Sequence, residues 1–270
     1  MERPAWAPQG IDISVPSVSR MYDYYLGGSH NFEVDREAAR RAMGFIPGLP
    51  KIMKANRAFM RRTVEFASAQ GIRQFLDIGS GIPASGNVHE VATALDPEAR
   101  VLYVDHDAVA VAHSRAVLEG NDRAEVVNAD LRDPRKILQS PEAAALLDLE
   151  RPVALLLHFV LHFLTDRDQP YRAVAELRDA LAPGSLITIT HAAHDGLPVP
   201  LEDSEGSVEV YAETSSPMVM RTREQITRFF DGFELVEPGV VSMPDWRPDT
   251  PAEQEDPYAY AGFCGVGRKA

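Results

Sequence analysis

The stretch QFLDIGSG, residues 74–81, decides how the rest of the chain is interpreted. Residues 75–78 are typical of a short buried strand, and Gly79, Ser80 and Gly81 follow it as a turn. Asp77 interrupts the apolar run, and a carboxylate is rarely buried without a partner. Two glycines one residue apart let the backbone approach a bulky polar group. The stretch therefore predicts a nucleotide-like ligand over the carboxyl end of a parallel sheet.

Apolar and helical segments alternate from Arg73 onward, which is typical of an α/β protein with a doubly wound, mostly parallel, Rossmann-like sheet. The last two apolar segments have no helix between them, so we expect them to form an antiparallel hairpin at one edge. Residues 195–205 are acidic and predict a loop. We expect seven strands, at residues 75–78, 101–104, 125–127, 153–157, 186–190, 233–236 and 260–266.

Helical segments fill the chain before the first strand. We expect residues 1–71 to form an N-terminal helical cap, or lid, and residues 72–270 to form the Rossmann-like ligand-binding domain. About 70 residues of helix are few for an independent domain, so the two parts are predicted to form one structural unit.

Composition restricts the partners. The 270-residue chain has a net charge of −13 and no stripe rich in Lys and Arg, so we expect no nucleic-acid partner. The longest apolar run, residues 152–164, is too short to span a bilayer, and no signal peptide is evident. Cys264 is the only cysteine, which fits a reducing compartment. We expect a cytoplasmic protein that acts on a small molecule; the oligomeric state stays open.

Three aspartates lie at the ends of three successive predicted strands: Asp77, Asp105 and Asp130. The carboxyl ends of parallel strands meet along one crevice, so these carboxylates are expected to lie side by side. Each could instead be a helix cap or turn residue, a role that Asp often fills. All three occurring together, with the glycine turn between the first two, favours a shared ligand.

The sequence DIGSG, residues 77–81, resembles the signature of class I S-adenosylmethionine-dependent methyltransferases. That resemblance implies that Asp77 organises the turn beside the methionyl end of the cofactor. It also implies that Asp105 binds the ribose and Asp130 binds the adenine amino group. The cofactor would be S-adenosyl-L-methionine, and the implied contacts at these strand ends are Asp77, Gly79, Ser80, Gly81, Asp105, His106, Asp130 and Leu131.

Two longer segments narrow the resemblance. SRMYDYYLGGSHNFEVD near the N-terminus and the run that continues from Gly81 to Glu90 are similar to an actinobacterial group of predicted methyltransferases, once catalogued as a domain of unknown function. This resemblance covers nearly the whole chain and implies a methyl donor, but it names no acceptor.

A nicotinamide cofactor is the competing interpretation, because residues 79–84 also fit G-x-G-x-x-G/A. Pro83 removes a backbone N–H where a pyrophosphate would need donors. Asp105 lies 26 residues after Gly79, beyond the usual spacing of about 20. An NAD(P)-dependent oxidoreductase is therefore the third alternative. The second is a protein that binds S-adenosylmethionine or S-adenosylhomocysteine without transferring a methyl group.

Histidines near the ends of the fourth and fifth strands are the catalytic candidates: His158, His162 and His191. Any of them could be a general base near neutral pH. His158 and His162 are four residues apart, a spacing that on a helix could bind a metal. The first of them ends a strand, however, so we predict no metal site.

The N-terminal segment supplies further cofactor candidates: Tyr22, Gly28, Asn31 and Arg57. The first three lie in a helix and its exit turn, which could close over the cofactor and exclude water. Arg57 could bind the methionyl carboxylate through two hydrogen bonds. Ordinary helix packing and an exposed helix arginine remain the alternatives.

Overall fold

An eight-stranded sheet forms the centre of the computed structural model, which describes residues 12–84, 86–195, 201–249 and 262–270. Its strand order is β3-β2-β1-β4-β5-β8-β6, and the short β7 pairs with β8. The first five strands are parallel, and β6, β7 and β8 pair antiparallel. The strands are β1 Gln74–Ile78, β2 Arg100–Asp105, β3 Ala124–Asn128, β4 Ala154–His158, β5 Leu186–Ala192, β6 Phe233–Leu235, β7 Val241–Ser242 and β8 Gly262–Lys269.

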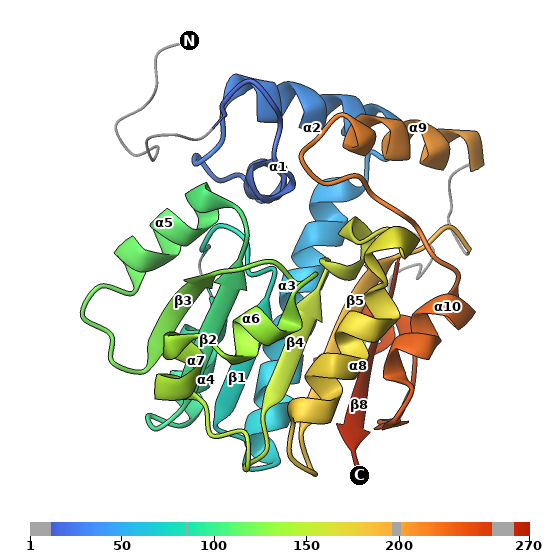
Figure 1. The fold of residues 1–270 in the computed structure, drawn as a ribbon. Helices are drawn as coiled ribbons and strands as arrows, with labels where there is room; N and C mark the ends of the chain where they lie inside the picture. The colour runs from blue at the N-terminus through green and yellow to red at the C-terminus, as the bar shows by residue number, and fades with distance from the viewer. Residues whose placement is uncertain (1–11, 85, 196–200, 250–261) are drawn as a thin grey trace.

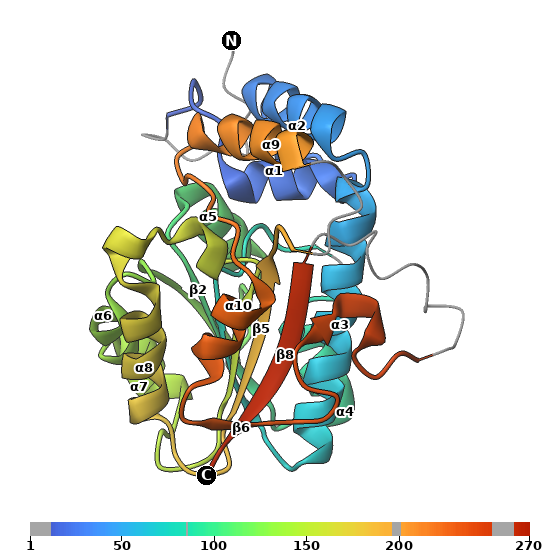
Figure 2. The ribbon, with the colours of Figure 1, turned by 90° about the vertical axis from the view of Figure 1, so that its right-hand side faces the viewer.

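Helices cover both faces of this sheet (Figures 1 and 2). On one face α3, α4 and α5 share a hydrophobic core with the strands, and on the other face α6, α7, α8 and α10 share a second core. Both faces of the strands are therefore covered, which explains why their sequences are continuously apolar. The helices are α3 Leu49–Ala69, α4 Val88–Leu95, α5 Ala108–Val117, α6 Pro134–Leu138, α7 Pro141–Leu146, α8 Pro170–Ala180 and α10 Arg223–Thr227.

Three more helices form the cap above the carboxyl ends of the strands (Figure 1). They are α1 Val18–Tyr25, α2 Glu33–Phe45 and α9 Leu201–Ala212. The long α3 begins beside these helices and continues down the face of the sheet (Figure 2). Short 3₁₀ turns occur at Leu161–Phe163, Asp166–Asp168, Arg228–Phe230 and Met243–Asp245.

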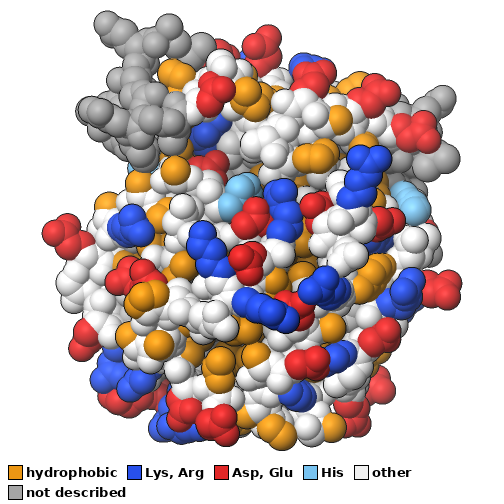
Figure 3. All heavy atoms as spheres, in the orientation of Figure 1, with side chains coloured by type: hydrophobic (Ala, Val, Ile, Leu, Met, Phe, Trp, Pro, Cys, Tyr) orange, Lys and Arg blue, Asp and Glu red, His pale blue; other side chains and the backbone are white. Residues whose placement is uncertain are grey.

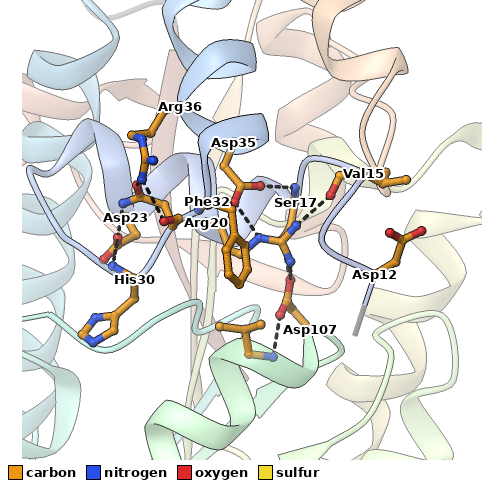
Figure 4. Close-up of polar contacts among 12 residues, drawn as sticks. Asp12, Val15, Ser17, Arg20, Asp23, His30, Phe32, Asp35, Arg36 and Asp107 are labelled. Atoms are coloured by element: carbon orange, nitrogen blue, oxygen red, sulfur yellow. Dashed lines mark hydrogen bonds and ion pairs between the residues drawn. The ribbon is translucent and has the colours of Figure 1, made fainter. Parts of the chain in front are cut away.

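A buried ion pair fixes the cap, as Figure 4 shows. The Arg20 guanidinium lies 2.8 Å from the Asp35 carboxylate, and both side chains are buried. Asp35 also accepts hydrogen bonds from the backbone N–H groups of Ser17 and Phe32. The Ser17 hydroxyl donates to Asp107, whose carboxylate caps α5 of the sheet domain. The Arg20 guanidinium also lies 3.9 Å from Asp107, so buried charges with partners link the cap to α5.

The expected fold class is confirmed, with two differences. The antiparallel hairpin is present, but β8 lies between β5 and β6, and β7 adds an eighth strand of two residues. Residues 260 and 261 of the last expected strand lie outside the described residues. The loop expected over residues 195–205 is wrong from Leu201 onward, because α9 begins there and packs against α2.

The surface mixes both signs of charge: acidic and basic side chains are interspersed over the face shown in Figure 3. Of the helices in the described parts of the chain, none is both long enough and apolar enough to cross a membrane.

Candidate active site

One large cavity lies between the cap and the carboxyl ends of β1 to β5. It contains about 1410 Å³ of empty space, counted out to where it opens into solvent. It extends from the glycine turn after β1 to the cap helices α1 and α9. Twelve of the expected site residues line it: Tyr22, Arg57, Asp77, Gly79, Ser80, Gly81, Asp105, His106, Asp130, Leu131, His158 and His162.

The glycine turn after β1 lets a ligand come close to the backbone. Gly79 and Gly81 have φ angles of 76° and 67°, a region that favours glycine. The backbone N–H groups of Gly79 and Ser80 donate to the carbonyl of Val104, which fixes the turn against β2. The Ser80 hydroxyl is buried and has no hydrogen-bond partner among the described residues. A buried hydroxyl without a partner is costly, so this atom fits a bound polar ligand.

Asp105 ends β2 directly beside that turn. Its two carboxylate oxygens accept hydrogen bonds from the backbone N–H groups of Gly81, at 2.7 Å, and Asp107, at 2.8 Å. Burial raises the pKa of this carboxyl, and the two N–H donors oppose that shift. Because each oxygen keeps a second lone pair, Asp105 can also accept from two ligand hydroxyls.

Asp77 lines the cavity near Arg57. Its side chain is buried, and none of the described residues donates a hydrogen bond to it. Burial raises its pKa to about 7, although the positive charge of Arg57 acts in the opposite direction. A cationic ligand group would complete the environment of this carboxylate.

Arg57 and Tyr22 reach the cavity from the cap helices. The Arg57 guanidinium donates to the carbonyl of Gly86 at 2.9 Å. Asn56 donates to the Tyr22 hydroxyl at 2.9 Å and accepts from Thr190 of β5 at 2.7 Å. The buried Asn56 thus connects α1, α3 and the sheet next to the site.

Asp130 and His106 lie at the rim. The Asp130 side chain is 41% exposed and lies 3.2 Å from the Arg132 guanidinium. His106 is 44% exposed, and its Nε2 lies 3.5 Å from the hydroxyl of Ser216, in the segment after α9. Both side chains remain open to a ligand that enters from solvent.

Gly28 and Asn31 do not line the cavity, in contrast to the expectation from the sequence. Asp23 explains their presence, because its carboxylate accepts from the Asn31 amide at 2.7 Å and from the His30 N–H at 2.9 Å. A side chain at Gly28 would collide with the same carboxylate. Figure 4 shows Asp23 and His30 at this turn. The pair therefore builds the exit turn of α1.

His191 does not line the cavity either. Arg221 donates to its Nε2 at 3.0 Å, so Nδ1 must carry the proton that is donated to the carbonyl of Ala192. Burial lowers the His191 pKa to about 3. Both ring nitrogens are occupied, so the structure removes His191 from the candidates for a general base.

His158 and His162 do line the cavity, but as neutral rings. Burial lowers the pKa of His158 to about 3, and its Nε2 lies 2.8 Å from the Thr188 hydroxyl. His162 also has a pKa well below the usual value because of burial. Its Nδ1 accepts from the backbone N–H of Ala192, so Nε2 carries the proton. His162 is therefore a hydrogen-bond donor through Nε2.

The cavity also contains residues that the sequence did not indicate, above all Ser207 and Tyr211 on α9. The Tyr211 hydroxyl lies 3.2 Å from the hydroxyl of Tyr25 on α1. Ser207 and Tyr211 are four residues apart and share one helix face, the signal that could have indicated them. Gly206 and the acidic residues before it do not indicate a helix, so the sequence did not predict α9.

The described residues contain no group of three or more His, Cys, Asp or Glu side chains that could hold a metal ion. The site is therefore defined by its carboxylates, its glycine turn and its neutral histidines.

The fold and this cavity define a class I S-adenosylmethionine-dependent methyltransferase, with S-adenosylmethionine as cofactor. The chain belongs to the S-adenosyl methyltransferase family, whose profile matches residues 4–270. The unpartnered Ser80 hydroxyl, Asp77 and the open glycine turn fit that cofactor.

Solved structures agree with this assignment. The chain is similar to a methyltransferase candidate from Thermobifida fusca YX, with 41% identity, a TM-score of 0.91 and coverage of 98% of this chain and 99% of that one. It is also similar to a DUF574 family protein from Streptomyces avermitilis MA-4680, with 38% identity, a TM-score of 0.90 and coverage of 96% and 99%. Mitomycin 7-O-methyltransferase MmcR shares only the fold, at 15% identity, a TM-score of 0.52 and coverage of 82% and 56%. A search of curated proteins found no match.

Proposed function

We propose that this protein transfers a methyl group from S-adenosylmethionine to a small-molecule acceptor held beneath the cap. The open cavity supports this most directly, because it continues from the glycine turn to the cap helices. A protein that only bound the cofactor would not need free space beyond it. The NAD(P)-dependent alternative is not favoured, since the chain belongs to a methyltransferase family.

Bound S-adenosylmethionine supplies an electrophilic methyl group: its bond to sulfur breaks, with the electron pair left on sulfur, as the acceptor atom forms the new bond. The glycine turn lets the backbone approach the nucleoside, and the free Ser80 hydroxyl donates to it. Asp105 accepts from the ribose hydroxyls, and Asp130 accepts from the adenine amino group. His106 and Leu131 border the same nucleoside.

The cap end of the cofactor site recognises the amino-acid part. Arg57 binds the methionyl carboxylate, and the buried Asp77 receives the amino group, which is cationic at neutral pH. Tyr22 covers this end, with its hydroxyl fixed by Asn56. In this arrangement α1 and α2, together with α9, act as a lid over the carboxyl ends of the strands.

The histidines orient the acceptor and do not deprotonate it. His158 and His162 have strongly lowered pKa values because of burial, so both are poor bases at neutral pH. The acceptor's proton, where it has one, stays on the methylated product and passes to water as the product is released. Alignment of the acceptor and exclusion of solvent by the cap then supply the catalysis. A cytoplasmic location fits the free, buried Cys264.

Two measurements test this function. Isothermal titration calorimetry with S-adenosylhomocysteine should detect binding by the wild-type protein, and its absence at millimolar ligand would refute the cofactor site. Incubation with methyl-labelled S-adenosylmethionine and metabolite extracts should label a small molecule. Cofactor binding with no labelled product in any extract would instead favour a binding protein without transferase activity.

A further inference from the structure

The lining of the cavity divides by charge. Among the described residues, the Asp, Glu, Lys and Arg side chains that line it lie at the ends of β1 to β3 or on α3: Arg57, Asp77, Asp105, Asp130 and Arg132. The described lining beneath the cap and beside β4 and β5 has none of these residue types. We call this part the acceptor chamber and define it by Tyr25, His162, Phe163, Ser207, Tyr211 and Met218.

Contacts between side chains and between backbone groups bring these residues together around one cavity. The ring of Phe163 lies 6.0 Å from that of Tyr211 and 4.3 Å from that of His162. The Tyr25 and Tyr211 hydroxyls are 3.2 Å apart. The backbone N–H of Val219 donates to the carbonyl of His162, which places the preceding methionine beside this loop. The chamber therefore joins α1, α9 and the loop after β4.

The chamber remains uncharged at neutral pH. Burial lowers the pKa of His162 well below its usual value and raises the pKa of Tyr211 to about 12. The pKa of Tyr25 is also raised by burial. A charged group placed here would lose its hydration. The charge of Arg221 reaches His162, but that guanidinium is already bonded to backbone carbonyls, to His191 and to Asp166.

The acceptor chamber has few polar side-chain atoms, and two of them can bind a ligand. The Ser207 hydroxyl is fully buried and has no hydrogen-bond partner among the described residues. His162 presents a proton on Nε2, since its Nδ1 accepts from the backbone. Aromatic rings and methionine thioethers otherwise form the surface, and both pack well against flat apolar molecules.

We infer that the methyl acceptor is a neutral, flat, mainly apolar molecule with an oxygen substituent that hydrogen-bonds to Ser207 and His162. This inference rests on the proposed function and deepens it, since it concerns the second ligand of the same cavity. The molecule lies between the cap and the β4 loop, next to the cofactor, and Ser207 acts as a specificity-determining residue.

Three matched probes test the charge preference in the wild-type protein saturated with S-adenosylhomocysteine. They are 2-naphthol, which is neutral at pH 7, 2-naphthoate, which is anionic, and 2-naphthylmethylammonium, which is cationic. Because an unpaired charge is not compensated in the chamber, 2-naphthol should bind at least about tenfold more tightly than either ion. Naphthalene fluorescence gives the three Kd values.

Variants on α9 test the location. Ser207→Phe fills the chamber and should weaken 2-naphthol binding at least about tenfold, while Ser207→Ala removes only one hydrogen bond and should weaken it about threefold. Glu209→Ala lies on the exposed side of the same helix and should change neither ligand's affinity. S-adenosylhomocysteine affinity within about twofold of wild type shows that each variant is folded.

Several outcomes would overturn the inference. They are an ion that binds as tightly as 2-naphthol, no 2-naphthol binding by the cofactor-loaded protein, or unchanged 2-naphthol binding in a folded Ser207→Phe variant. Loss of S-adenosylhomocysteine binding in the wild-type protein is a separate result, which refutes the proposed function. The probe series without cofactor would still measure the charge preference.

Discussion

The cofactor half and the acceptor half of the cavity are built from different kinds of contact. At the end of β2, Asp105 accepts from backbone groups 2 and 24 residues away in the chain. In the acceptor chamber, the two tyrosine hydroxyls that meet belong to residues 186 positions apart. Neighbouring strand ends form the cofactor half. The acceptor half forms only when α9 packs against α2 in the cap.

This difference implies that the two halves can be altered independently. Strand ends and backbone N–H groups hold the charged half in place, and replacing a side chain in the acceptor chamber leaves them untouched. Residues of the acceptor chamber can therefore change without loss of cofactor binding. The predictions that follow test that independence.

The largest effect is expected for Arg221→Leu, behind the acceptor half. The buried guanidinium donates to the carbonyls of Leu161 and Leu164 and to His191. Losing these charge-assisted bonds should lower the free energy of unfolding by about 3 kcal/mol or more. Urea denaturation measures this free energy of unfolding. Arg115→Leu, on the exposed side of α5, is the control and should change the free energy of unfolding little. A loss below about 1 kcal/mol would show that water replaces these contacts.

Asp105→Asn should have the next largest effect, confined to the cofactor half. An amide cannot accept from both backbone N–H groups and the ribose at once, so affinity for S-adenosylhomocysteine should fall by about 10- to 100-fold. Calorimetry measures this, with the exposed Asp122→Asn as a matched control. Affinity equal to wild type would remove Asp105 from the site.

The pH dependence of cofactor binding tests Asp77, a residue of the cofactor half. The pKa of Asp77 is raised by burial to about 7, so this carboxyl is protonated below that pH and must lose its proton when the ligand's ammonium binds. Affinity for S-adenosylhomocysteine should therefore fall about tenfold per pH unit below about pH 7 and level off above it. In Asp77→Asn the slope should disappear. A wild-type profile that is flat between pH 5 and 7 would contradict this role.

The smallest effect on the cofactor is expected for Tyr211→Phe in the acceptor chamber. The change removes one hydroxyl and its contact with Tyr25, which should cost about 1 kcal/mol in the free energy of unfolding. Affinity for S-adenosylhomocysteine should stay within about twofold of wild type, because the two halves are independent. A tenfold loss in calorimetry would show that they are coupled.

The sequence predicted much of the cofactor half. The family, the cofactor and the Rossmann-like sheet are confirmed, and the strand-end aspartates all reach one cavity. These residues were recognisable because a strand, a turn and its ligand contacts lie within a few positions of one another. Which atom each residue binds stays a prediction.

The acceptor half was poorly predicted for physical reasons. Residues 201–212 form a helix mainly by packing on α2, which local propensity does not reveal. His191 was a candidate base until its contact with Arg221, 30 residues away, showed that both ring nitrogens are occupied. Gly28 and Asn31, which the sequence predicts as ligand contacts, instead lie against the buried Asp23.

By itself the sequence determined the sheet, the glycine turn and the methyl donor, because backbone geometry and short-range spacing encode them. Only the tertiary structure decided that the histidines are neutral and that Ser207 faces the cavity. Those properties depend on burial and on contacts between distant segments, and neither exists until the cap has closed over the sheet.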